Sequence, residues 1–123
     1  MENNRIVKTF LELVAIDSES NNEGPFQAYL KERCEALGMI VYEDDTAKQT
    51  GLGAGNLICR LEGSAKLPPL MFCCHSDTVV PGVGIQPQIK NEIIYSDGET
   101  ILAADDKAGN GEVRQHGGER RAA

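Results

Sequence analysis

Apolar residues near the N-terminus recur at the spacing of a helix. The positions that follow this period are Ile6, Val7, Phe10, Leu11, Leu13 and Val14. They predict a helix of about three turns that ends near Asp17, with Asn3 or Asn4 as its N-cap. The polar stretch SESNNEG that follows predicts a loop.

A second helix is expected from Pro25 onward, because proline is favoured in the first turn of a helix. The apolar face of this helix consists of Phe26, Leu30, Cys34 and Leu37. Gly38 is expected to end it, since glycine readily adopts the left-handed conformation found at helix C-termini.

Short β-type runs occupy the middle of the chain. Residues 39–44 (MIVYED) and 56–63 (NLICRLEG) predict two strands. Residues 67–75 (LPPLMFCCH) are almost wholly apolar, as expected of an interior strand. Two helices followed by strands with an apolar central member indicate the α/β class.

Two glycine-containing segments predict connections between these elements. TGLGAG at 50–55 lacks the lysine of a phosphate-binding loop and precedes a strand, so we expect a mobile connection. Ser96-Asp97-Gly98 is expected to turn a hairpin formed by residues 92–99 and 101–105.

The net charge and the apolar runs of the chain argue against nucleic-acid and membrane partners. Twelve basic and nineteen acidic side chains among 123 residues give a net charge of −7. This balance argues against a non-specific nucleic-acid binder, which needs a basic face. No apolar run approaches the ~20 residues of a membrane-spanning helix, and the N-terminus has no export signal. We therefore expect a cytoplasmic protein of about one domain, without a membrane partner.

The four cysteines predict reduced thiols. Cys73 and Cys74 are adjacent and no C-x-x-C pair occurs, which suits neither a disulfide framework nor a zinc-finger array. Mostly buried thiols are therefore expected. A redox role for the Cys73–Cys74 pair is the weaker alternative, because no nearby cation would lower a thiol pKa.

The motif HSDTVVPG at 75–82 directly follows the apolar run. On an extended backbone His75 and Asp77 point to the same side. The Asp77 carboxylate can then accept the N–H of one ring nitrogen and leave the other nitrogen to bind a metal. From this motif alone, a histidine satisfied by a loop carbonyl, with Asp77 beginning a turn before Pro81, is an equally good interpretation.

A second polar motif, AADDKAGNG at 103–111, places two carboxylates and a lysine at a predicted strand end. Adjacent aspartates repel one another, and a bound divalent cation would relieve that repulsion. For this motif taken alone, a solvated polar turn is the better interpretation.

Together the two motifs resemble those of the M20-type zinc peptidases, most closely the peptidase T-like tripeptidases. The matching segments are LELVAIDSES (11–20), TGLGAGNLICRLEG (50–63), HSDTVVPG (75–82), IIYSDG (93–98) and ILAADDKAG (101–109). The resemblance implies that residues 1–109 are the N-terminal part of a three-layer α/β/α zinc-peptidase catalytic domain. Residues 110–123, rich in glycine and charge, are expected to be a disordered tail outside the family.

The resemblance also implies roles for three residues. His75 would bind one zinc ion, Asp77 would be the catalytic residue that orients the imidazole, and Asp105 would bridge two zinc ions. Asp106 is not usually a ligand in the family, and the peptide bond between Asp105 and Asp106 tends to be cis. The implied activity is hydrolysis of short peptides such as tripeptides by a metal-activated water molecule, with a glutamate transferring the proton.

Several parts of the family's site have no counterpart in this sequence. They are the general-base glutamate, the remaining metal ligands and a dimerisation domain. A catalytic zinc ion usually has three protein ligands, so we expect weak zinc binding at best and no peptidase activity. The sequence suggests a truncated or frame-shifted peptidase. Glu112 and His116 are not expected to substitute, because ordering their segment costs ~1–2 kcal/mol per residue.

A non-catalytic α/β fragment is the alternative function. In either case an incomplete sheet would expose an edge and an apolar face, so self-association is expected.

Overall fold

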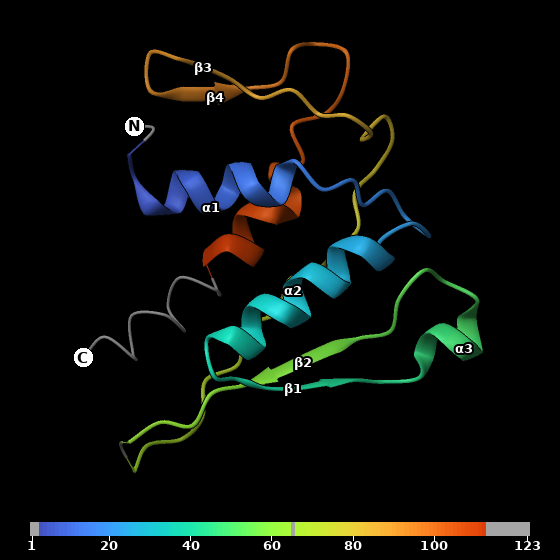
Figure 1. Cartoon of the computed structure of the whole chain (residues 1–123), viewed down its shortest axis with the longest axis vertical. Coiled ribbons are helices and arrows are strands. Elements are labelled where there is room, and N and C mark those ends of the chain that lie inside the picture. Colours follow the sequence, from blue (N-terminus) through green and yellow to red (C-terminus); the bar gives the residue numbers. More distant parts are fainter. Residues whose placement is uncertain (1–2, 65, 113–123) are drawn as a thin grey trace.

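Helices and two small antiparallel sheets make up the part of the chain that the computed structural model describes, residues 3–64 and 66–112. The elements are α1 (Arg5–Val14), α2 (Gly24–Ala36), β1 (Ile40–Glu43), α3 (Thr46–Thr50), β2 (Leu57–Arg60), β3 (Gln88–Lys90), β4 (Ile93–Tyr95) and a last helix over residues 104–112. Figure 1 shows α1 beside this last helix and the β1–β2 pair beside α2.

The first helix, α1, forms as the apolar spacing predicts. The side chain of Asn4 caps it by accepting a hydrogen bond from the backbone N–H of Ile6 at 2.8 Å. The helix ends at Val14 rather than near Asp17, because the chain tightens there and the Ile16 N–H donates to the Leu13 carbonyl. The residues after it are thus free to run along a distant segment of the chain.

The second helix, α2, also follows its pattern. Pro25 lies in its first turn, and Phe26, Leu30 and Cys34 are buried. Gly38 has a φ of 81°, the left-handed conformation expected of the residue that ends a helix. The predicted position of α2 is confirmed, and so is the burial of these three residues, while Leu37, the fourth of the predicted face, is half-buried at the C-cap.

The strands β1 and β2 pair antiparallel, with Val41 opposite Cys59. The short helix α3 between them was not predicted. It follows Asp44, whose carboxylate accepts hydrogen bonds from Thr46 and Asn56. The hydroxyl of Thr46, followed by the Asn56 donors, holds the pKa of Asp44 well below its ordinary value.

The predicted hairpin is wrong, because residues 92–99 do not pair with residues 101–105. The hairpin consists of β3 and β4 and turns at Asn91 and Glu92, which both have positive φ angles. This is the twist that tight two-residue hairpins require. Residues 96–98 do turn, with the Gly98 N–H donating to the Ser96 hydroxyl, but the segment after them leads into the last helix.

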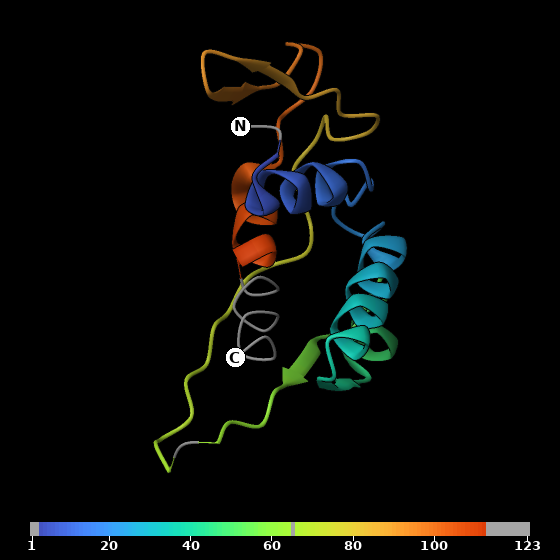
Figure 2. The same cartoon turned by 60° about the vertical axis from the view of Figure 1, so that its left-hand side comes forward.

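The predicted interior strand at 67–75 is also wrong. This segment is extended but pairs with no strand in the described part of the chain, and Leu70 and Met71 are 77% and 91% exposed. In Figure 2 the chain between β2 and this segment extends away from the helices. An interior strand needs a hydrogen-bonded neighbour on each side, so an apolar pattern alone does not create one.

The apolar core consists of two clusters on two faces of α1. Phe10 and Val14 pack with Ile85 and Ala103, while Leu13 packs with residues of α2. The expected α/β class is confirmed, with the helices forming most of the core. The last helix continues to residue 112, three residues beyond the expected boundary, whereas residues 113–123, including His116, lie outside the described residues.

Candidate metal-binding site

His75 and Asp105 lie side by side although 30 residues separate them in sequence. The Nε2 atom of His75 is 2.9 Å from Oδ1 of Asp105. His75 ends the extended apolar segment at 67–75, and Asp105 lies in the first turn of the last helix. Their side chains are 50% and 95% exposed, so solvent and solutes can reach both.

The other ring nitrogen of His75 faces Asp77. Its Nδ1 atom is 2.9 Å from the Asp77 backbone oxygen and 3.2 Å from Oδ1 of the same residue. Both sequence interpretations therefore contribute, since the backbone carbonyl accepts from Nδ1 and the carboxylate lies within ion-pair distance of it. In the protonated ring, Nδ1–H donates to Asp77 and Nε2–H donates to Asp105.

The electrostatics of this group favour a cation. The hydrogen bond that the His75 ring donates to Asp105 is the main cause that raises the pKa of His75 above its ordinary value. The hydrogen bond from the Ser20 hydroxyl is the main cause that lowers the pKa of Asp77. Two carboxylates around one imidazole therefore stabilise positive charge at this position.

The Asp106 carboxylate contacts the last helix itself. The peptide bond between Asp105 and Asp106 is cis, as the resemblance implied. The Asp106 carboxylate accepts from the Gly109 N–H at 3.1 Å, and a Cβ atom at Gly109 would lie only 2.3 Å from it. This carboxylate therefore has a hydrogen-bond partner within the last helix, and that Asp106 is not a metal ligand stays a prediction.

Lys107 anchors the last helix to the chain that follows α1. Its side chain is 1% exposed, its ammonium donates to the Ile16 carbonyl, and Nζ lies 4.6 Å from the centroid of the Phe26 ring. Burial lowers the pKa of Lys107 to about 8. Sequence reasoning missed this role, because a lysine beside two aspartates has the composition of a surface turn.

Asn110 joins the last helix to the His75 backbone. Its side-chain amide donates to the His75 carbonyl at 2.7 Å and to the Asp106 carbonyl at 2.9 Å. The thiol of Cys74 donates to the side-chain oxygen of Asn110 at 3.4 Å. Asn110 lies in the segment that was expected to be a tail, so composition concealed its role.

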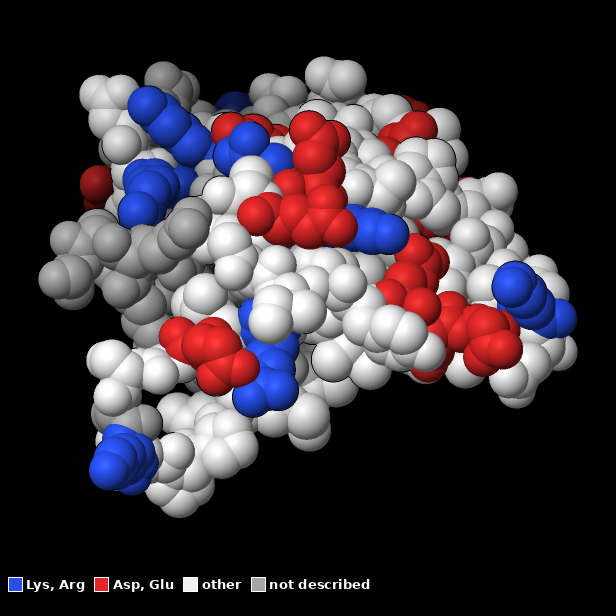
Figure 3. Space-filling model, turned by 60° about the horizontal axis from the view of Figure 1, so that its bottom comes forward, with Lys and Arg blue, Asp and Glu red and all other residues white. Residues whose placement is uncertain are grey.

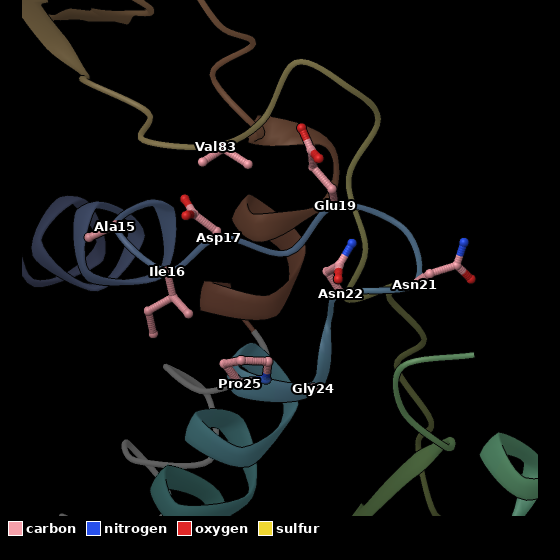
Figure 4. A pocket seen from close by; sticks show the side chains of 9 residues that line it. All are labelled: Ala15, Ile16, Asp17, Glu19, Asn21, Asn22, Gly24, Pro25 and Val83. Carbon is pink, nitrogen blue, oxygen red and sulfur yellow. The ribbon is translucent and has the colours of Figure 1, made fainter. Parts of the chain in front are cut away.

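The loop after α1 runs beside residues 77–84. The two segments form a parallel bridge between Glu19 and Thr78, and Asp17 accepts from the Gly84 N–H at 2.9 Å. Figure 4 shows the carboxylates of Asp17 and Glu19 directed towards the segment that contains Val83. An open cavity of about 700 Å³ lies there, and neither His75 nor Asp105 lines it.

His75 and Asp105 fit a divalent metal in the chemistry of their donors, an imidazole and a carboxylate. Within the part of the chain that the structure describes, no group of three or more His, Cys, Asp or Glu side chains is placed to hold a metal ion. The two residues are therefore a pair of donors and not a complete set.

Surface charge and helix length bear on the other classes of partner. Acidic and basic side chains are interspersed on the face drawn in Figure 3, so the described residues form no continuous basic surface there. None of the described helices is long and apolar enough to cross a membrane.

Known proteins resemble the chain at high sequence identity. No protein-family profile matches it. The Bacillus subtilis protein YqjE is 50% identical over 105 residues, which cover 85% of this chain and 28% of YqjE. A tripeptidase of Staphylococcus aureus has 50% identity and a TM-score of 0.86, and the match covers 89% of this chain and 30% of the tripeptidase. The aminopeptidase PepT of Bacillus cereus has 47% identity and a TM-score of 0.89, over 92% of this chain and 31% of PepT.

These matches cover only part of each known protein. The chain spans about three-tenths of the length of each of these proteins. Over that part, sequence and fold agree with those of the tripeptidase and of the aminopeptidase. The resemblance to peptidase T-like tripeptidases is therefore confirmed, and the chain is related to one part of a tripeptidase or PepT-type aminopeptidase.

Proposed function

We propose that this chain is part of a cytoplasmic, zinc-dependent tripeptidase of the M20 type and supplies two ligands of its metal centre. The observation that supports this most directly is the 2.9 Å distance between His75 Nε2 and Asp105 Oδ1. The pair belongs to a chain that is 50% identical to part of a tripeptidase.

The chain's own residues would divide the work at such a centre. His75 would bind one metal ion through Nε2, Asp105 would provide a carboxylate shared by two ions, and Asp77 would orient the imidazole through Nδ1. A bound zinc ion would polarise the peptide carbonyl of the substrate and lower the pKa of a water molecule. The proposed substrates are short peptides, in keeping with the similarity to a tripeptidase.

Zinc titration of the 123-residue chain, followed by NMR of the histidine rings, tests the ligand assignment. We expect weak binding that shifts the His75 signals, because two protein donors are fewer than the three usual for a catalytic zinc. His75→Ala and Asp105→Ala should each remove this response, whereas His116→Gln is the matched control and should retain it. Binding that persists in both alanine variants would contradict the assignment.

We expect this chain to have no peptidase activity on its own. Among the described residues, His75 and Asp105 form a pair of metal donors, and no group of three or more donors occurs. The purified chain, saturated with zinc, should release no product from a tripeptide above the rate of a His75→Ala control. Turnover that His75→Ala abolishes would show that the chain completes a catalytic site.

The second candidate function is a non-catalytic fragment that associates through its apolar surface. The exposed side chains of Leu67, Leu70 and Met71 favour it. Absence of any zinc response in the titration, together with concentration-dependent association, would favour this function over the first.

A further inference from the structure

Two cysteines from different elements face one another where α2 packs against β2. On α2, Leu30 and Cys34 are four residues apart and therefore share one face of the helix. On β2, Leu57 and Cys59 are two residues apart and point to the same side of the strand. Leu57 packs against the apolar cluster that contains Leu30. One step further along each element, Cys34 is therefore opposite Cys59.

The two thiols are in contact. In Figure 1 the C-terminal end of α2, which carries Cys34, lies beside the end of β2. The Cys34 thiol donates a hydrogen bond to the Cys59 sulfur, and this bond lowers the pKa of the Cys59 thiol below its ordinary value. Both cysteines are reduced in the structure. Because their sulfur atoms already touch, a small movement of the side chains brings them to bonding distance.

Cys34 and Cys59 differ in how easily a dissolved reagent reaches them. Cys34 is buried, at 8% exposure, whereas Cys59 is partly exposed. The thiolate is the reactive form of cysteine, and the hydrogen bond from Cys34 increases the thiolate fraction of Cys59. Cys59 is therefore suited to react first, and Cys34 is placed to attack the sulfur atom of Cys59 afterwards.

We propose that Cys34 and Cys59 are a site of reversible oxidative modification, at which a low-molecular-weight disulfide creates a covalent bond between α2 and β2. The Cys59 thiolate attacks the small disulfide, forms a mixed disulfide and releases one small thiol. Cys34 then loses its proton to solvent, attacks the Cys59 sulfur and releases the second small thiol. The two protein thiols lose two electrons and two protons, and the small disulfide gains them. An excess of the small thiol reverses both steps, as is usual for disulfides of cytosolic proteins.

Trypsin digestion and mass spectrometry identify the bond. Cleavage after lysine and arginine places Cys34 in residues 34–48, Cys59 in residues 49–60, and the other two cysteines in residues 67–90. The test uses the Cys73→Ser variant, because Cys73 is exposed and would couple separate chains. The folded variant is incubated with oxidised glutathione, its remaining thiols are alkylated, and the digest is analysed without reductant.

We expect the main oxidised product to be peptide 34–48 joined to peptide 49–60, with the loss of two hydrogen atoms, and dithiothreitol should reverse it. A further Cys34→Ala change should abolish the joined peptide and leave glutathione attached to Cys59. A further Cys59→Ala change should leave Cys34 unmodified, because Cys34 is buried. Cys74→Ala is the matched control and should retain the joined peptide, since Cys74 is close enough to Cys59 for an electrostatic interaction and is the competing partner.

Three results would overturn the proposal. The first is the absence of the joined peptide in Cys73→Ser, which decides the question even if Cys34→Ala fails to fold. The second is a product that joins peptide 49–60 to peptide 67–90 in place of peptide 34–48. The third is an equal yield of the joined peptide in urea, because the fold would then not select this pair of thiols.

Discussion

The buried contact between Lys107 and Phe26 predicts a measurable coupling energy. Nζ lies 4.6 Å from the ring centroid, inside the ~6 Å range of a cation–π interaction. Both side chains are fully buried, so the contact is largely desolvated. A desolvated contact of this kind is worth about 2 kcal/mol, against about 0.5–1 kcal/mol at an exposed site.

A double-mutant cycle isolates this energy. Phe26→Leu removes the ring but keeps an apolar side chain, and Lys107→Met removes the charge but keeps the length of the side chain. Each single variant also changes packing and desolvation, and these effects cancel in the cycle when the sites respond independently. We expect a coupling of about 1–2 kcal/mol in the free energy of unfolding.

Urea unfolding followed by far-UV circular dichroism measures the four free energies, because the chain has no tryptophan to report by fluorescence. Phe10 lies in the other apolar cluster, so Phe10→Leu combined with Lys107→Met is the control and should be additive. A coupling below about 0.5 kcal/mol for the Phe26 cycle lies within ordinary non-additivity and would refute the contact.

Four further predictions follow from the local structure. Gly111→Ala should raise the free energy of unfolding by about 0.5–1 kcal/mol in chemical denaturation, because its Cβ atom would meet neighbours at an ordinary 3.6 Å. Gly109→Ala should lower the free energy of unfolding, since a Cβ atom at position 109 would collide with the Asp106 carboxylate. The lowered pKa of Asp44 stabilises the fold above its unfolded pKa of about 4, and this contribution is lost as pH falls. Asp44→Asn should therefore reduce Tm near pH 6 and flatten its acid dependence, whereas Asp45→Asn should retain the acid dependence. Met71→Lys should weaken self-association in sedimentation experiments with little change in Tm, because Met71 is 91% exposed.

Local patterns predicted α1 and α2 because local interactions form them. Asn4 caps α1 and Pro25 begins α2 through contacts within one or two turns. The interior strand at 67–75 and the hairpin at 92–105 failed because each depended on a pairing partner. Apolar character indicates that a segment can be buried, while its hydrogen-bonded neighbours decide whether it becomes a strand.

Sequence patterns likewise predicted only some residues of the candidate site. His75, Asp77 and Asp105 were predicted from motifs, and the structure brings all three together. Ser20 and Asn110 were missed, because a single serine or asparagine in a polar stretch has no pattern that distinguishes it from a loop residue. Their partners lie 57 and 35 residues away, and only the fold brings them into contact.

The parallel bridge between Glu19 and Thr78 also has a kinetic consequence. The hydrogen bonds around it connect residues separated by 57 to 67 positions, so a long loop must close before any of them forms. Contacts of high sequence separation slow folding, whereas helices such as α1 and α2 form early. In pulse-labelling hydrogen exchange, the Thr78 amide, which donates to the Ser18 carbonyl, should therefore gain protection after the amides of both helices.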